Sequence, residues 1–166
     1  MPVQQDVDSI EWMRAQWQER GEPAPARLAA MTSVMRANVI MTEVVERALK
    51  KLKLTRSGYL VLITLQLAPN SERPMGQLSK SLLVNPTTMT LIVDQLEKAK
   101  LVTRQPNLAD RRTVLARLTA KGLRTTREAS AALAEIGFGV GDLDERTTQR
   151  LVDDLRTLRR GLGDQG

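Results

Sequence analysis

The spacing of apolar and polar positions predicts a mainly helical chain with one small β element. Apolar residues recur at threes and fours in seven stretches, the spacing of an amphipathic or buried helix. These stretches cover residues 8–20, 26–52, 54–68, 75–82, 86–99, 119–136 and 144–162. Between residues 101 and 118 the period changes to two in a pair of runs rich in β-branched residues, which predicts a β-hairpin, or wing. The expected fold is therefore mainly α with a small β-wing.

Three of these helices carry recognisable start signals. Asp8 is followed three residues later by Glu11, the arrangement of a capping box. Asn85 can accept a hydrogen bond from the first turn of the next helix, and Pro86 suits that turn because it has no N–H to leave unpaired. Thr119 follows the second run of the hairpin, so it is expected to cap the helix after it.

The stretch 74–119 is thus expected to form a helix, a turn, a second helix and a two-stranded wing. In the second helix one face is expected to be exposed and the opposite, apolar stripe buried. The stripe comprises Met89, Ile92, Val93, Leu96 and Ala99. The exposed set comprises Thr87, Thr88, Thr90, Leu91, Asp94, Gln95 and Lys98. Hydroxyl and amide groups on such a face can hydrogen-bond base edges or phosphates. The turn of the hairpin, residues 106–112, ends in Arg111 and Arg112, so the wing carries cations at its tip.

Charge is concentrated in the same region. The whole chain carries a net charge of +6 and has a sequence pI of about 10.2. Residues 98–127 contain nine basic residues against Asp110 alone, a net charge of +8. Such a cluster can be a solvated face, but its coincidence with a winged helix favours a nucleic-acid binder. Aromatic residues make up 2% of the chain, so base stacking on single strands is not expected and double-stranded DNA is the preferred partner.

The composition also excludes most catalytic chemistry. The chain has no cysteine and no histidine, so disulfides, thiol chemistry, zinc sites and Ser-His nucleophiles are ruled out. Glu43 and Glu46 lie one turn apart, but without a further ligand they are interpreted as solvated charges or partners of Arg47. The glycines of residues 137–141 follow a helix rather than a strand, which favours a helix stop over a nucleotide loop. We therefore expect no enzyme activity, no metal and no cofactor.

The N-terminal residues lack the basic and apolar regions of a signal peptide, and no long apolar run suggests a membrane span. A cytoplasmic protein without a membrane partner is expected.

The stretch 74–119 resembles the winged helix-turn-helix of the MarR family of bacterial transcriptional regulators. The wing pattern, Asp-x-Arg followed by an alternating strand that ends in Leu-Thr, is the more specific part of the resemblance. The flanking helices fit the family's layout from about residue 26 to residue 162. The matching residues are Leu78, Ser79, Leu82, Thr90, Val93, Asp94, Leu96, Glu97, Leu101, Val102, Arg104, Asp110, Arg112, Leu118, Thr119 and Gly122.

The resemblance implies a dimeric regulator, expected to be a repressor, that binds a pseudo-palindromic operator. The second helix would enter the major groove, and Arg112 would reach the minor groove or its phosphates from the wing. Arg104 and Arg111 are expected to contact phosphates, and Asp110 to organise the wing by bracing an arginine. The predicted DNA-binding residues are Asn85, Thr87, Thr88, Thr90, Gln95, Arg104, Arg111 and Arg112.

Four regions follow from the same layout. Residues 1–25 would form an extra N-terminal helix and linker, 26–53 a dimerisation helix, 54–119 the winged lobe, and 120–166 the C-terminal dimerisation helices. The apolar stripes on both sides of the helix at 26–52 suit this division, because one side can face its own lobe and the other a partner subunit.

Regulators of this family commonly sense a small aromatic or lipophilic effector between the dimer helices and the winged lobe. The candidate lining here is Trp17, Met31, Met35 and Tyr59, although the preferred interpretation of these residues is that they belong to the core. An effector would act by changing the distance between the two recognition helices.

Two departures from the family pattern concern the recognition helix. Family members often carry Arg at the positions of Leu91 and Gln95, and Gly at that of Lys100. Fewer cations on the helix would leave more of the affinity to the arginines of the wing region. They also leave open an alternative, an architectural or interaction protein with little sequence preference, which a flat affinity across duplex sequences would distinguish from a regulator.

Overall fold

The computed structural model describes residues 8–107, 110 and 112–164, and the chain divides into two compact units, Met1–Glu43 and Val44–Gly166. In the first unit, helix α1 (Ser9–Glu19) precedes the larger part of α2 (Pro25–Lys50). Asp8 caps α1 by accepting hydrogen bonds from the N–H groups of Ile10 and Glu11 at 2.7 and 3.2 Å, as its position predicts. The indole N–H of Trp17 donates to the carbonyl of Pro23 at 2.9 Å, which ties the turn after α1 to that helix.

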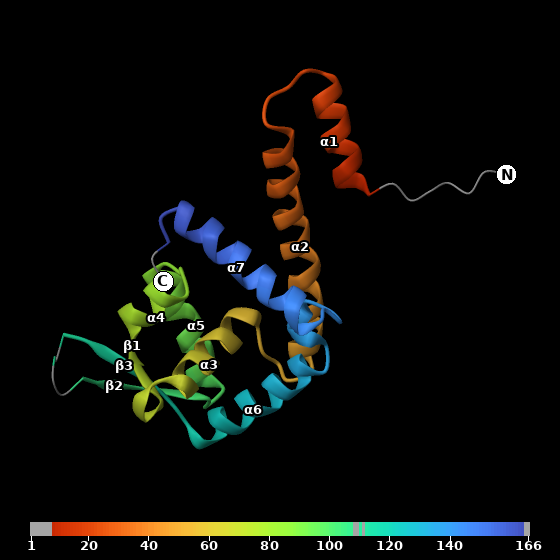
Figure 1. The fold of residues 1–166 in the computed structure, drawn as a ribbon. Helices are drawn as coiled ribbons and strands as arrows, with labels where there is room; N and C mark the ends of the chain where they lie inside the picture. The colour runs from red at the N-terminus through yellow and green to blue at the C-terminus, as the bar shows by residue number, and fades with distance from the viewer. Residues whose placement is uncertain (1–7, 108–109, 111, 165–166) are drawn as a thin grey trace. The chain divides into compact units, whose positions relative to one another are not determined.

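The second unit contains the end of α2 and all remaining elements (Figure 1). Its α-helices are α3 (Arg56–Leu67), α4 (Met75–Ser81), α5 (Pro86–Lys98), α6 (Ala120–Ala134) and α7 (Glu145–Gly161). Two short 3-10 helices are η1 (Pro69–Ser71) and η2 (Gly137–Gly139), and the strands are β1 (Glu72–Pro74), β2 (Val102–Pro106) and β3 (Val114–Leu118). The expected mainly helical fold with a small β-wing is confirmed.

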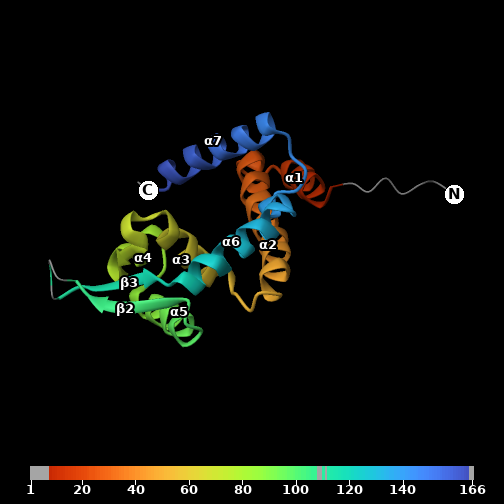
Figure 2. The same cartoon turned by 90° about the horizontal axis from the view of Figure 1, so that it is seen from below.

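The strands form an antiparallel sheet of order β1-β3-β2, with α5 lying alongside β2 (Figure 2). The predicted hairpin is present, and its register pairs Arg104 with Ala116. Strand β1 was not predicted; it pairs Arg73 with the same Ala116 from the other side. Three residues that end in a proline are too short to display a period of two, so the pairing becomes visible only in the fold.

The core of the second unit is built around α3. Val61, Leu62 and Leu65 of this helix are fully buried, as expected from its almost wholly apolar sequence. The remaining buried hydrophobic residues from the surrounding elements include Leu49, Leu78, Met89, Val93, Val102, Ala116 and Leu133. Each fully buried aliphatic side chain contributes roughly 1.5–3 kcal/mol relative to exposure, so α3 fixes α4, α5 and the sheet as one lobe.

Some boundaries differ from those predicted. Helix α2 ends at Lys50 rather than residue 52, and Ala99 is the exposed C-cap of α5 rather than part of its buried stripe. Lys100 follows in the left-handed region, with φ +60°. The N–H of Lys100 donates to the carbonyl of Glu97 at 2.8 Å and that of Leu101 to Leu96 at 2.9 Å, the two bonds of a Schellman motif. This geometry explains why glycine suits the position.

The junction between the wing and α6 depends on Thr119 and Gly122. Thr119 caps α6 by accepting a hydrogen bond from the N–H of Gly122 at 2.9 Å, and its hydroxyl donates to the carbonyl of Lys100 at 2.8 Å. Its own N–H donates to the carbonyl of Leu101 at 3.0 Å. A Cβ atom on Gly122 would lie 2.1 Å from that same Leu101 oxygen, so only glycine fits there.

Replacement of Gly122 by Ala is therefore expected to lower the free energy of unfolding by about 3 kcal/mol, because the Leu101 backbone must move. Urea denaturation followed by circular dichroism measures the change. Gly76→Ala is the matched control, since nothing lies within 4 Å of a Cβ at that helical position. The control should be neutral or stabilising by up to about 1 kcal/mol. Equal stability of the two variants would contradict the packing described.

Candidate nucleic-acid interface

Helix α5 presents a polar surface on the side opposite its buried stripe. Asn85 fixes the start of the helix, because its side-chain oxygen accepts a hydrogen bond from the N–H of Thr88 at 2.8 Å. Met89 and Val93 are fully buried and hold the helix against the lobe. The outward positions Thr87, Thr88, Thr90, Leu91, Gln95 and Lys98 are all exposed. The predicted exposed residues thus share one face, except that Asp94 is half-buried.

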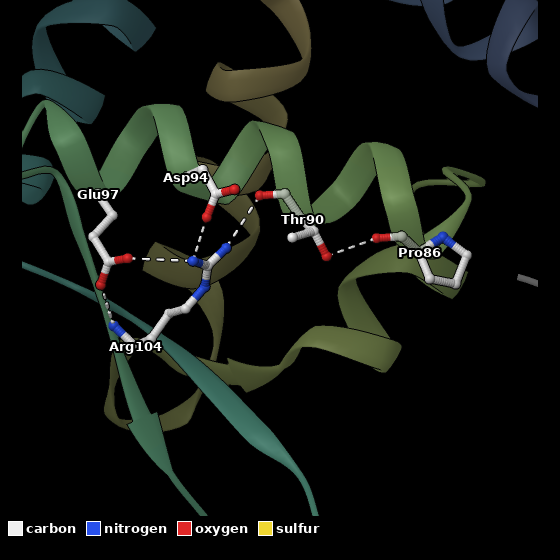
Figure 3. Close-up of polar contacts among 5 residues, drawn as sticks. All are labelled: Pro86, Thr90, Asp94, Glu97 and Arg104. Atoms are coloured by element: carbon white, nitrogen blue, oxygen red, sulfur yellow. Dashed lines mark hydrogen bonds and ion pairs between the residues drawn. The ribbon is translucent and has the colours of Figure 1, made fainter.

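Arg104 on strand β2 reaches across to α5 (Figure 3). Its guanidinium bonds the carboxylate of Asp94 and, at 3.3 Å, that of Glu97, while Nη2 donates to the carbonyl of Thr90 at 3.1 Å. Its main-chain N–H donates to the other oxygen of Glu97 at 3.1 Å. Because β2 is an edge strand, that N–H would otherwise lack a partner in the sheet. We call these four residues the Arg104 clamp.

The partners of Arg104 in the clamp were not predicted from the sequence. The guanidinium faces two carboxylates and its side chain is 26% exposed, so its charge is already largely compensated. A phosphate contact by Arg104 stays a prediction. Asp94 and Glu97 lie three residues apart on one helix, and that spacing was the available signal, but the strand that supplies the arginine is set only by the tertiary fold.

Thr90 takes part in the clamp through its carbonyl, and its hydroxyl donates to the carbonyl of Pro86 one turn earlier, at 3.0 Å. The hydroxyl hydrogen is therefore occupied within the helix, and the oxygen retains lone pairs that can accept a bond from outside.

Asp110 organises the turn of the wing. Its carboxylate accepts hydrogen bonds from the hydroxyl of Thr113 at 2.6 Å and from the main-chain N–H of Arg112 at 3.0 Å. These two hydrogen bonds, of which the one from Thr113 has the larger effect, hold the pKa of Asp110 below its usual range. The charged form therefore stabilises the turn. Asp110 thus contacts Arg112 through the arginine's backbone N–H, and the prediction that it braces an arginine stays a prediction.

A groove of about 520 Å³ separates the wing from the helix-turn-helix. Arg112, Thr113 and Val114 line it from the wing, and Thr90 lines it from α5. The other lining residues are Met75, Gly76 and Arg104. The cation predicted at the wing tip thus faces the groove, close to the exposed face of α5. Arg111, the other predicted wing cation, lies outside the described residues.

This arrangement matches known proteins in sequence and fold. The MarR family profile matches residues 54–114, the winged lobe. Sco5413, a MarR family transcriptional regulator from Streptomyces coelicolor, is 34% identical, with a TM-score of 0.77 over 84% of this chain and 97% of that protein. The chain belongs to the MarR family. No curated protein sequence matches it.

Two more distant MarR structures share the fold. Sco3205 from Streptomyces coelicolor, solved in complex with DNA, is 22% identical with a TM-score of 0.74, and the match covers 82% of this chain and 87% of Sco3205. CouR from Rhodococcus jostii RHA1, solved with p-coumaroyl-CoA, is 23% identical with a TM-score of 0.67 over 75% and 87% of the two chains. The MarR family is one of regulators rather than enzymes.

The effector residues predicted from the MarR resemblance fall in different units. Trp17, Met31 and Met35 belong to the first unit, where the two methionines are 51% and 62% exposed. Tyr59 belongs to the second unit; it is buried, and its hydroxyl shares a hydrogen bond of 3.0 Å with Ser130. Trp17 is 36% exposed, so of the four candidates only Tyr59 is buried in the core of this chain. Effector binding stays a prediction.

The Arg104 clamp predicts a measurable coupling. In a double-mutant cycle of Arg104→Gln and Asp94→Asn, we expect a coupling energy of about 1 kcal/mol in the free energy of unfolding, since the pair is half-buried and reinforced by Glu97. Urea titration of the four proteins measures it. The control is the looser pair of Arg117 and Glu72, whose closest atoms lie 3.8 Å apart and whose arginine side chain is 52% exposed, and it should show little coupling. Equal coupling in both pairs would contradict the clamp.

Proposed function

We propose that this MarR family member is a dimeric, sequence-specific regulator of transcription that binds a pseudo-palindromic site on double-stranded DNA. We further propose that it is a cytoplasmic repressor released by a small aromatic or lipophilic effector. The observation that carries the proposal is the pairing of the exposed face of α5 with a basic wing across one groove.

The geometry supports different roles for α5 and the wing on DNA. The face of α5 offers hydroxyl and amide groups, which suit base edges in the major groove. Arg112 on the exposed wing suits a phosphate or a narrow minor groove. Because Arg104 is engaged by Asp94 and Glu97, we assign it the role of positioning the wing against α5. Sco3205, which shares the fold, was solved in complex with DNA, and this supports DNA as the partner by analogy.

Unpartnered apolar surfaces support a dimer. Helix α7 has no buried residue within the chain, although an apolar stripe runs along it. That stripe contains Leu151, Leu155, Leu158 and Leu162, all of them exposed. Exposed apolar residues on α2 are Met31, Val34, Met35, Val39 and Ile40. Surfaces of this kind mark protein interfaces, and two-fold doubling lets one protein contact two half-sites about one helical turn apart.

Helix α2 also has the length and composition of a membrane span, with a mean hydropathy of 1.2 over its most apolar 18 residues. The core helix of an assembled protein has the same properties. Since the end of α2 packs into the winged lobe through the fully buried Leu49, we assign its apolar surface to the dimer interface.

The ligand-bound structure of CouR is the basis for proposing an effector. A ligand can release DNA only if it binds the DNA-incompetent arrangement of the two lobes more tightly than the competent one. Trp17, Met31, Met35 and Tyr59 remain the candidate contacts.

Arg112→Ala is expected to weaken binding to a specific duplex, selected from a random library, by about 1–3 kcal/mol. The slope of log affinity against log salt should fall by about one per subunit, because each subunit of the dimer loses a phosphate contact. Fluorescence anisotropy measures both quantities. Arg20→Ala, which removes an exposed arginine after α1 and outside residues 98–127, is the control and should change neither. Unchanged affinity of Arg112→Ala would refute the assignment of the wing.

Leu155→Asp is expected to convert the dimer to a monomer without unfolding it, because no residue of α7 is buried in the single chain. Analytical ultracentrifugation measures the mass, and circular dichroism checks the fold. Leu67→Asp places the same charge at a residue of α3 that is 78% exposed, and it should leave the dimer intact. A monomeric wild-type protein, or a dimeric Leu155→Asp variant, would contradict the proposed interface.

A further inference from the structure

Leu91 is an apolar residue in the middle of the polar face of α5. It is 58% exposed and lies one turn after Thr87 and one turn before Gln95, so the three side chains form a stripe along the helix. The buried stripe of Met89 and Val93 occupies the opposite side. Leu91 therefore contributes nothing to the core of the lobe and points toward whatever α5 contacts.

The acidic residue nearest to this stripe, Asp94, is held on the wing side of α5. Asp94, the acidic residue of the outward half of α5, is engaged by the guanidinium of Arg104 on the wing side of the helix (Figure 3). The guanidinium offsets the charge of Asp94 and holds its carboxylate beside β2, while the clamp as a whole, with Glu97, keeps a net charge of −1 on that side of the helix.

The chemistry of Leu91 limits what it can recognise. Its side chain has no donor or acceptor, so it gains nothing from phosphates or from the polar atoms of base edges. In the major groove the one apolar group on a base edge is the C5-methyl group of thymine. Burying a leucine against polar base edges would instead cost their hydration.

We propose that Leu91 is a specificity residue that packs on the C5-methyl group of one thymine in each half-site. This inference rests on the proposed function, because it requires α5 to lie in the major groove. The flanking Thr87 and Gln95 supply hydrogen bonds to adjacent base edges, and Leu91 supplies discrimination by methyl contact alone.

The test uses the full chain and a duplex selected from a random library. Each thymine is replaced in turn, in both half-sites, by deoxyuridine, which lacks only the methyl group. One position should weaken wild-type binding by about fourfold per half-site, the effect of one buried methyl group. At that position the Leu91→Ala variant should bind thymine and uracil duplexes equally. Leu67→Ala, which shortens an exposed leucine outside α5, should retain the wild-type preference for thymine.

A second substitution in the duplex separates the effect of the methyl group from that of the hydrogen-bonding pattern of thymine. At the sensitive position, 5-methylcytosine should bind the wild-type protein about fourfold per half-site more tightly than cytosine. The Leu91→Ala variant should not distinguish these two duplexes.

The outcomes distinguish this inference from the proposed function. Two results would overturn the inference without contradicting the proposed function. In the first, a specific duplex is selected but no thymine methyl group affects binding. In the second, the preference for the methyl group survives Leu91→Ala. Failure to select any preferred duplex would overturn the proposed function and this inference with it.

Discussion

The contact between Arg104 and α5 makes the helix and the wing a single unit. A two-stranded hairpin alone is at best marginally stable in water, and its edge strand exposes unpaired N–H groups. Here Glu97 accepts the outward N–H of Arg104, and its other oxygen joins Asp94 in compensating the guanidinium. The same arginine also bonds the carbonyl of Thr90. The distance between the wing and the exposed face of α5 is thereby fixed before any ligand arrives.

Other contacts within the winged lobe stabilise the arrangement of α5 and the wing. The hydroxyl of Thr119 links the start of α6 to the end of α5, and Gly122 leaves room for the carbonyl of Leu101 between them. Asp110 closes the wing turn through Thr113 and the backbone of Arg112. Pre-organisation of this kind reduces the entropy lost on binding, because fewer groups must be ordered when the partner is engaged. Because each winged lobe is rigid, a small movement of one lobe relative to the other would change the affinity of the dimer for its two half-sites.

Local features of the fold could be predicted from the sequence, and long-range ones could not. The caps at Asp8, Asn85 and Thr119 were predictable because a cap depends on a few adjacent residues. The hairpin followed from a change of period. Strand β1 and the partners of Arg104 depend on packing between distant segments, which no local pattern records. The exposure of Met31 and Met35 could not be predicted either, since the spacing of apolar residues is the same in a helix that packs in its own core and in one that packs on a partner subunit.

Sequence-specific binding is tested by an anisotropy titration of the wild-type protein onto the duplex upstream of its own gene and onto a shuffled duplex, each at several salt concentrations. We predict tight, salt-dependent binding of two subunits to the upstream duplex and much weaker binding to the shuffled one. Equal affinity for both duplexes, with a steep salt dependence, would contradict sequence-specific regulation at this site and support an architectural role. Absence of binding to either duplex at low salt would contradict DNA as the partner.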